Sequence, residues 1–279
     1  MSDERELWFA EWGAPDGLPV LLLHGGPGSR LFPVDLDAVE QRKVRLVTVD
    51  RPGLGRSTRS PLHGLRSVAD DLVQLADALG LSDLAVAGYS AGGTYALALG
   101  AAASTRVTRI ATMSTPAGPE VPDGFVAGDA GRAFVSDLAV SDRAAAVDAT
   151  AAFFAQYIDD PDSFLDPSTT PEADMFLLED RAERAEFVDR AIREGLRQGP
   201  EGAADDTVAH IGPWDVDLDD VAQPVCVFHG RQDIFVPPAD ADYLAGHLPS
   251  AQQVLWDDAG HVAALRRFGE AIDWLTSTG

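Results

Sequence analysis

The sequence is almost free of cysteine, and it lacks the residue groupings that bind metals or nucleotides. Cys226 is the only cysteine among 279 residues, so no disulfide can form within the chain. It stands in an apolar run that ends at Phe228, which predicts a buried and unreactive thiol. No cluster of His and Asp has metal-ligand spacing, and no Gly-x-Gly-x-x-Gly follows the first apolar strand segment. We therefore expect neither a metal ion nor a nucleotide cofactor.

Basic residues are also scarce. The chain has 21 Lys and Arg against 45 Asp and Glu, a formal net charge of -24, and Lys43 is its only lysine. There is no basic cluster to which phosphates would bind, and so acidic a surface should be repelled by anionic membranes. We therefore expect neither a nucleic acid nor a membrane as partner.

Long apolar runs are absent as well, and none approaches the roughly 20 residues that a membrane-spanning helix needs. Residues 1–6 do not combine a basic segment with a following apolar one, as a secretion signal would. We therefore expect a cytoplasmic protein. Hydrophobic residues make up 46% of the chain, enough to bury the core of one large α/β domain with an insertion, or of two small domains.

Short, solidly apolar segments are the main pattern that the sequence does show. Such segments are typical of strands covered on both faces, as in a parallel sheet. They alternate with segments of helical periodicity. We expect strands at 6–12, 19–23, 44–49, 84–87, 107–113, 225–228 and 253–256, and helices at 35–43, 65–79, 94–103, 239–247 and 262–276. This order predicts an α/β fold with a mostly parallel, doubly wound sheet.

The pattern changes between residues 116 and 213, where helical periodicity continues without strand candidates. We expect helices at 134–138, 143–157, 173–183 and 187–196. We interpret 116–213 as a helical cap, or lid, inserted into a core formed by residues 1–115 and 214–279. Two roles are open for its aromatic residues, which either pack the cap's own core or line a substrate pocket beside the sheet. The candidate substrate-binding residues are Tyr89, Phe153, Tyr157 and Phe176.

One turn carries the pattern of a nucleophile. Gly88-Tyr-Ser-Ala-Gly92 reads Gly-x-Ser-x-Gly, between an apolar strand segment and a helix of small residues. Such a turn is too sharp for a Cβ atom at either glycine, and it raises the serine hydroxyl above the edge of the sheet. The pattern is common by chance. Ser90 is therefore a candidate nucleophile that needs support from other loops.

Two further loops supply the groups that a serine nucleophile needs. A serine hydroxyl is nearly unreactive at neutral pH, so an imidazole must accept its proton and a carboxylate must orient that imidazole. Asp233 and His261 each follow a predicted strand, at the edge where doubly wound sheets build sites. Asp257 and Asp258 compete with Asp233 for the role of the acid, but neighbours on one loop rarely orient each other's side chains well. His229 ends its strand and is expected to be buried and structural.

A glycine-rich loop supplies backbone donors. His24-Gly-Gly-Pro-Gly28 follows a predicted strand, and because Pro27 has no amide hydrogen the donor at this point would be Gly26. The amide of Ala91, at the start of the helix after the serine, points at the same space. We expect these two amides to form an oxyanion hole, in which one donor typically contributes ~3 kcal/mol.

These motifs together are highly specific. The set comprises His24-Gly-Gly-Pro-Gly28, Asp50-Arg-Pro-Gly-Leu-Gly-Arg-Ser57, Gly88-Tyr-Ser-Ala-Gly92, His229-Gly-x-x-Asp233 and Gly260-His261. The chain resembles the serine hydrolases of the α/β-hydrolase fold over nearly its whole length outside the insertion. That fold has the chain order Ser, Asp, His. The glycine-rich loop resembles proline iminopeptidases in particular, which implies a cis bond between Gly26 and Pro27.

Two departures from proline iminopeptidases favour other substrates. Their loop usually reads Asp-Gln-Arg-Gly where this chain has Asp50-Arg-Pro-Gly53, and their turn usually reads Gly-Gly-Ser-Trp-Gly. Both differences favour esterases, haloperoxidase-like enzymes and C–C hydrolases. Our hypothesis is a serine hydrolase that cleaves a small ester or amide through an acyl-enzyme. The alternatives are an aminopeptidase, for which Glu179 and Glu183 are candidate amine ligands, and a ligand-binding or signalling homologue without turnover.

Overall fold

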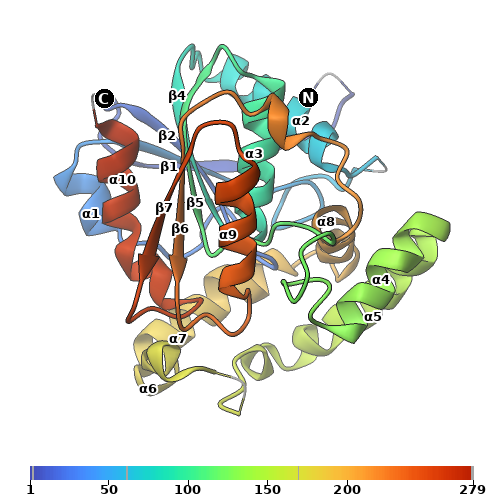
Figure 1. Ribbon diagram of the computed structural model, residues 1–279. Helices are drawn as coiled ribbons and strands as arrows, with labels where there is room; N and C mark the ends of the chain where they lie inside the picture. Colours follow the sequence, from blue (N-terminus) through green and yellow to red (C-terminus); the bar gives the residue numbers. More distant parts are fainter. Residues whose placement is uncertain (2, 61, 169, 278–279) are drawn as a thin grey trace.

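Seven strands form one sheet at the centre of the protein (Figure 1). The computed structural model describes all residues except 2, 61, 169 and 278–279. The strand order is β1-β3-β2-β4-β5-β6-β7; among these described strands β1 pairs with β3 antiparallel, and the other five pairings are parallel. The strands are β1 (Phe9–Gly13), β2 (Pro19–Leu23), β3 (Arg45–Val49), β4 (Leu84–Tyr89), β5 (Val107–Met113), β6 (Val225–Gly230) and β7 (Ala251–Trp256). The predicted, mostly parallel sheet is confirmed.

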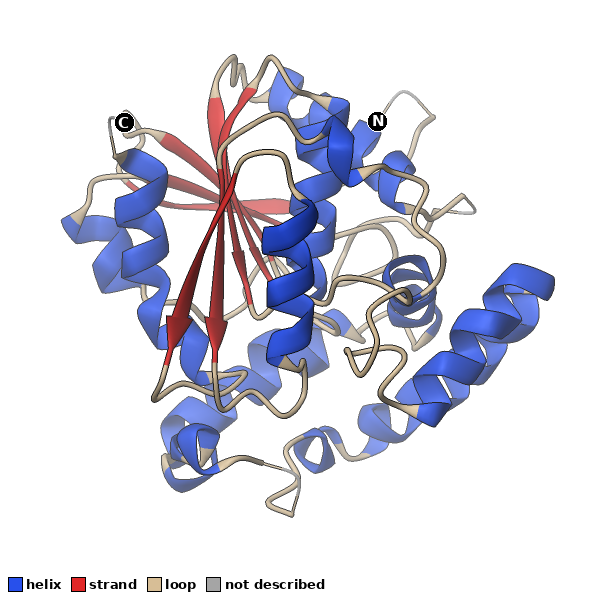
Figure 2. Cartoon of the chain, in the orientation of Figure 1, coloured by secondary structure: helices blue, strands red, loops and turns tan. Residues whose placement is uncertain are grey.

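Helices cover both faces of the sheet (Figure 2). One face carries α1 (Leu36–Gln41) and α10 (Phe268–Thr276), and the other carries α2 (Leu65–Ala78), α3 (Ala91–Ala102) and α9 (Pro238–His247). Successive side chains of a strand point to opposite faces. In β2, Val20 and Leu22 therefore pack into the hydrophobic cluster on the α10 side, while Leu21 and Leu23 pack into the cluster on the α2 side. Both sets must be apolar, which explains the unbroken apolar runs in the sequence.

Cys226 lies in the middle of this core. Its side chain is buried in β6, and burial raises the pKa of the thiol to about 11, as expected for an unreactive cysteine. Within the described part of the chain, no helix has both the length and the apolar character that crossing a membrane would require.

The insertion between β5 and β6 is helical, and no strand occurs among its described residues. Its elements are α4 (Ala130–Ser141), α5 (Arg143–Asp159), the 3-10 helices η1 (Pro161–Phe164) and η2 (Glu172–Asp174), α6 (Phe176–Glu179), α7 (Arg181–Phe187), the π-helical η3 (Val188–Arg193) and α8 (Glu201–Ile211). A 3-10 turn, η4 (Leu218–Asp220), precedes β6. In Figure 1, α6 and α7 lie next to the ends to which β6 and β7 point, whereas α4 and α5 extend outward. The division into a core and a cap at residues 116 and 213 stays a prediction.

Three segments differ from the sequence-based expectation. The helix expected over 173–183 is divided into η2, α6 and the start of α7. The segment expected as one helix over 262–276 is a 3-10 helix, η5 (Ala263–Arg267), followed by α10. The third difference is α8, which was not among the expected helices of the cap. Nearly every residue of α8 is buried, including Asp205 and Asp206, so its sequence lacks the one-sided apolar pattern of a surface helix.

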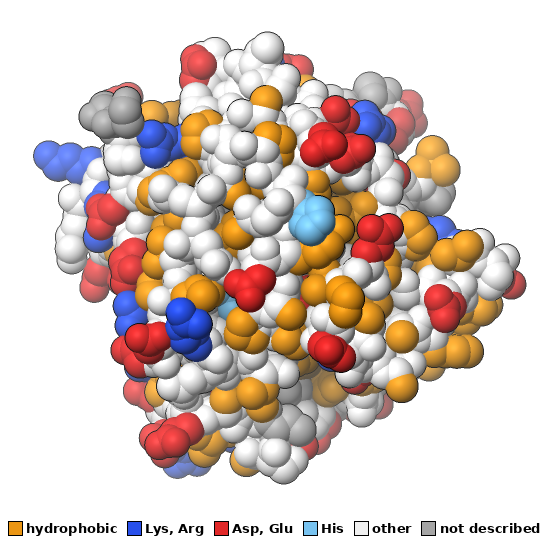
Figure 3. Space-filling model, viewed as in Figure 1, with side chains coloured by type: hydrophobic (Ala, Val, Ile, Leu, Met, Phe, Trp, Pro, Cys, Tyr) orange, Lys and Arg blue, Asp and Glu red, His pale blue; other side chains and the backbone are white. Residues whose placement is uncertain are grey.

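The outer surface of the cap mixes apolar and acidic side chains. Phe134 and Val140 of α4 and Phe153 of α5 are largely exposed. In the view of Figure 3, hydrophobic and acidic side chains alternate over the region of α4 and α5. Acidic groups therefore interrupt the exposed apolar surface of these two helices.

Candidate active site

Ser90 occupies a sharp turn between β4 and α3. Its backbone has φ 53° and ψ -128°, a region that residues other than glycine rarely adopt and that costs of order 1–3 kcal/mol. The surrounding structure holds this conformation, since the Ser90 amide donates to the Met113 carbonyl at 2.8 Å. A Cβ atom added at Gly92 would overlap the backbone carbonyl of Leu23. The close packing of β2 against the start of α3 therefore requires this glycine.

Asp233 and His261, the predicted acid and base, lie next to each other. The Nδ1 atom of His261 is 2.8 Å from Oδ2 of Asp233. The other carboxylate oxygen of Asp233 accepts the amides of Phe235 at 3.0 Å and Val236 at 2.8 Å. Burial alone would raise the pKa of Asp233, but His261 and the hydrogen-bond donors outweigh it and lower the pKa below its ordinary value. Asp233 is therefore ionised and fixed in direction.

Aromatic rings place His261 beside the serine turn. The ring of Tyr89, the residue before Ser90, lies 5.2 Å from the His261 ring, and its hydroxyl reaches the His261 carbonyl at 3.4 Å. The ring of Phe235 lies 5.0 Å from the same imidazole and is nearly half exposed. The neighbour of Ser90, Tyr89, therefore contacts the His261 ring. The partly exposed Phe235 contacts the same ring.

The alternative acids have other partners. The side chain of Asp257 is 89% exposed and pairs with Arg231, and that of Asp258 is 75% exposed and pairs with Arg267. His229 is buried at the end of β6, where its Nε2 atom bonds the Val236 carbonyl at 2.9 Å. These contacts favour Asp233 as the partner of His261.

The glycine-rich loop lies against the start of α3. The Gly26–Pro27 bond is cis, as the resemblance implied. A Cβ atom built on Gly26 would lie 3.6 Å from the Cβ of Ala91, so the two residues with the predicted oxyanion donors are neighbours. His24 is buried and bonds the Gly25 carbonyl, and burial together with Arg51 lowers the pKa of its ring to about 3. A neutral His24 of this kind serves the loop as a structural residue.

Of the four candidate substrate-binding aromatics, Tyr89 is the one in ring contact with His261. Phe153 is 54% exposed on α5 and packs against Phe154 and Tyr157 at 5.3 and 5.5 Å between ring centroids. Phe176 packs under the guanidinium of Arg266, whose Cζ lies 3.5 Å from the ring centroid. The contacts of Phe153 and Phe176 are packing within the insertion and at its border, and substrate binding by the four residues stays a prediction.

Sequence reasoning missed three buried charged residues near the site. Arg51 follows β3 and contacts the glycine-rich loop, and Asp206 of α8 pairs with it. Asp174 of η2 accepts the amide of Ala263, two residues after His261, at 2.7 Å. The sequence does not indicate that these residues are buried, because Asp and Arg usually lie on the surface and their partners are far apart in the chain.

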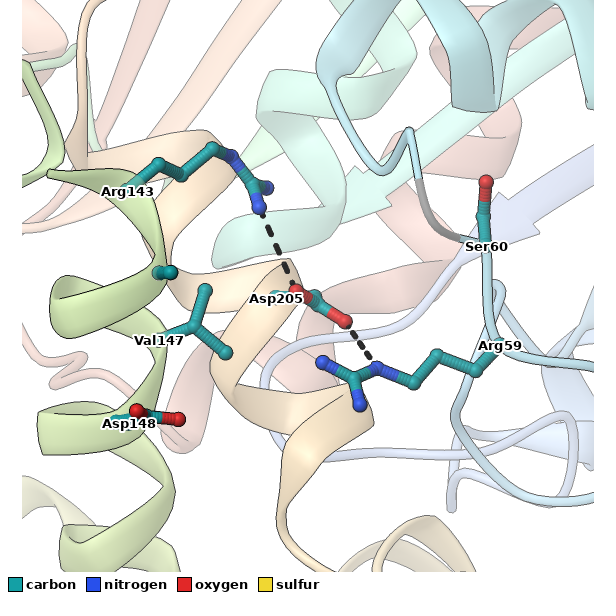
Figure 4. A pocket seen from close by; sticks show the side chains of 7 residues that line it. Arg59, Ser60, Arg143, Val147, Asp148 and Asp205 are labelled. Carbon is teal, nitrogen blue, oxygen red and sulfur yellow. Dashed lines mark hydrogen bonds and ion pairs between the residues drawn. The ribbon is translucent and has the colours of Figure 1, made fainter.

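A cavity of about 600 Å³ lies beside α5 and α8, apart from Ser90 and His261 (Figure 4). Asp205 accepts Arg59 at 2.5 Å and Arg143 at 3.5 Å within it, as the dashed lines in Figure 4 show. A second cavity, of about 450 Å³, is lined by residues of α4, α8 and the segment 62–65. Because the arginines of the first cavity already pair with Asp205, it presents no unpaired charge cluster.

Comparison with known proteins identifies the family. A family model described as alpha/beta hydrolase fold matches residues 19–267. The putative carbamate hydrolase RutD of Caulobacter vibrioides is 28% identical over 267 residues, covering 92% of this chain and 89% of that protein. A proline iminopeptidase of Xylella fastidiosa is 37% identical over 103 residues, 35% of this chain and 32% of the relative. A thermophilic esterase structure from Thermogutta terrifontis has a TM-score of 0.66 at 25% identity, covering 97% of this chain and 93% of that one.

The doubly wound sheet, the serine turn at its edge and these matches define an α/β enzyme of the hydrolase class. The chain belongs to the α/β-hydrolase fold family.

Proposed function

We propose that the protein is a serine hydrolase that cleaves a small-molecule ester or amide through an acyl-enzyme. The observation that carries this proposal is the 2.8 Å contact between His261 and Asp233 on the loops next to the strained turn of Ser90. A buried carboxylate fixed to Nδ1 of an imidazole leaves Nε2 as the atom that exchanges protons. A carboxylate, an imidazole and a serine at one sheet edge are the groups that acyl transfer needs.

In the proposed reaction, the Ser90 hydroxyl attacks the substrate carbonyl while His261 takes its proton. Asp233 keeps the imidazole oriented and supports its positive charge. The amides of Gly26 and Ala91 bind the oxyanion, and His261 then returns the proton to the leaving alcohol or amine. Water, activated by the same imidazole, releases the acid from Ser90.

A fluorophosphonate probe tests the nucleophile directly. We expect the probe to label the wild-type protein at Ser90 and to leave Ser90→Ala unlabelled, because the serine alone supplies the reactive oxygen. Thermal unfolding should show that both proteins are folded. A folded wild-type protein that stays unlabelled would refute the proposal.

Two substrates separate an esterase from an aminopeptidase. Of the two acidic residues considered for amine binding, Glu183 already pairs with Arg266 at 2.7 Å and Glu179 is exposed to solvent. We therefore expect p-nitrophenyl acetate to be turned over faster than Pro-β-naphthylamide. The reverse preference would favour a peptidase. A single burst of p-nitrophenol without further turnover would instead favour the ligand-binding homologue.

A further inference from the structure

The guanidinium of Arg51 bonds both Asp206 of helix α8 and two backbone carbonyls of the glycine-rich loop. Towards the cap, Nε donates to Oδ1 of Asp206 at 2.7 Å and NH2 donates to Oδ2 at 2.8 Å. Towards the core, NH1 donates to the His24 carbonyl at 2.5 Å and NH2 to the Gly25 carbonyl at 3.3 Å. Arg51 is fully buried, so water does not compete for these bonds. The fork of a guanidinium fits such a shared arrangement better than an ammonium would.

The bond to Gly25 bears on the predicted oxyanion donor through one peptide unit. The carbonyl of Gly25 and the amide hydrogen of Gly26 belong to the same planar group, and in a trans peptide they point in opposite directions. Arg51 on the carbonyl side therefore fixes where the Gly26 amide points. A cation at the carbonyl oxygen also polarises the peptide and makes its N–H a stronger donor.

Asp206 is held firmly in its place on α8. Its carboxylate is buried, and the Arg51 charge outweighs that burial and holds the pKa of this carboxyl well below its usual range. The Tyr95 hydroxyl donates to the Asp206 carbonyl at 3.1 Å, and the Arg51 guanidinium lies over the Tyr95 ring at 4.7 Å. The Asp206 Oδ2 atom lies 3.5 Å from where a Cβ on Gly26 would be. The ion pair therefore lies directly against the oxyanion loop.

We propose that Arg51 and Asp206 are positioning residues for the oxyanion hole, so that cap helix α8 sets the direction of the Gly26 amide. The inference rests on the proposed function, because it concerns the same acyl-transfer step. Asp206 orients the guanidinium, and the guanidinium orients the peptide between Gly25 and Gly26. Neither side chain touches the substrate.

The two members of the pair would fail in different ways. Without the charge of Asp206, the guanidinium loses its bidentate anchor and the Gly25–Gly26 peptide loses its fixed direction. Without the fork of Arg51, a single ammonium cannot bind both Asp206 oxygens and the carbonyls of His24 and Gly25 at once, so the Gly25–Gly26 peptide is no longer held in place. Both changes should weaken binding of the oxyanion more than binding of the ground-state substrate.

The test compares Asp206→Asn with Asp205→Asn. The two residues are adjacent in α8, and both are buried and paired with arginine. Asp206 pairs with Arg51, which contacts the glycine-rich loop, whereas Asp205 pairs with Arg59 and with Arg143 of α5. We expect Asp206→Asn to lower kcat for p-nitrophenyl acetate by about 10- to 100-fold with KM changed less than about threefold, since loss of a whole donor costs about 100- to 1000-fold. We expect Asp205→Asn to keep kcat within about twofold, because no oxyanion contact is lost.

Inhibition by phenylboronic acid gives a second measurement, because its tetrahedral serine adduct places an oxygen in the oxyanion hole. Its affinity should fall in parallel with kcat in Asp206→Asn and stay unchanged in Asp205→Asn. If Asp206→Asn does not fold, Arg51→Lys takes its place, and we expect the same loss of kcat from it. Wild-type kcat in a folded variant of either residue would overturn the inference alone. Absence of turnover and of fluorophosphonate labelling in the wild-type protein would overturn the proposed function, and this inference with it.

Discussion

The Nδ1 atom of His261 and the Oδ2 atom of Asp233 are 2.8 Å apart, although the two residues are 28 positions apart in the chain. They meet because β6 and β7 are paired in parallel along their whole length, with Gly230 opposite Trp256. The loops after these strands therefore leave the sheet side by side. One loop supplies the carboxylate and the other supplies the imidazole.

The first prediction concerns the choice of acid. We expect Asp233→Asn to lower kcat by about 10³- to 10⁴-fold, because an amide can stabilise the wrong tautomer of His261 and carries no charge. Asp257→Asn and Asp258→Asn should leave kcat within about twofold, since these exposed carboxylates pair with Arg231 and Arg267. Ester hydrolysis by the three purified variants measures this. A larger loss of kcat in either control than in Asp233→Asn would show that the acid lies on the loop after β7 and not at Asp233.

The second prediction concerns the turn itself. Gly92→Ala adds a methyl group that would overlap the Leu23 carbonyl, so we expect a loss of about 3 kcal/mol or more in the free energy of unfolding. Gly246→Ala is the matched control, because it lies in α9 with open space around its Cβ position. That change should instead stabilise the protein by about 0.5–1 kcal/mol. Urea unfolding of both variants decides the matter, and equal stabilities would show that the turn can relax.

The third prediction concerns the pH dependence of stability. Asp240 is buried where its carboxylate accepts the amides of Ala117 and Phe125, at 2.8 and 2.7 Å, and burial raises its pKa to about 6. The folded value lies above the unfolded value of about 3.9, so the folded protein binds the extra proton between these two values. The stability that Asp240 contributes is therefore present at low pH and is lost as the pH rises through about 6.

The measurement compares the free energy of unfolding of the wild-type protein with that of Asp240→Asn at several pH values. We expect the wild-type value to fall relative to the variant by about 2 kcal/mol between pH 4 and pH 7. The repulsion among the other acidic groups is shared by both proteins and cancels in the difference. A difference that does not change with pH would mean that folding leaves the pKa of Asp240 unchanged.

The strands and the residues at their ends were accessible from the sequence. A buried parallel strand must be apolar on both faces, and a serine turn needs glycine where β2 and α3 approach, so Leu21 and Gly92 each carry a local signal. The cis bond before Pro27 was implied by the resemblance of this loop to that of proline iminopeptidases, and it is confirmed. Chain order then placed Asp233 and His261 on neighbouring loops.

The contact of helix α8 with the glycine-rich loop through Arg51 and Asp206 could not be predicted from the sequence in this way. Arg51 and Asp206 are 155 positions apart, and each alone reads as an ordinary charged residue. Because α8 is buried on nearly all sides, its sequence has no amphipathic period to reveal it. For the aromatic residues of α5 the sequence leaves two roles open. The structure shows that Phe153 and Tyr157 contact each other, and their role in substrate binding stays a prediction.

The ion pair between Arg51 and Asp206 also limits how this enzyme can be recombined with its relatives. An insertion transferred from another family member would fit this core only if it also placed a carboxylate at the position of Asp206. A neutral residue there would leave the guanidinium of Arg51 buried without a counter-charge, which typically costs about 3–5 kcal/mol. Chimeras designed to change substrate range should therefore exchange residues 51 and 206 as a unit.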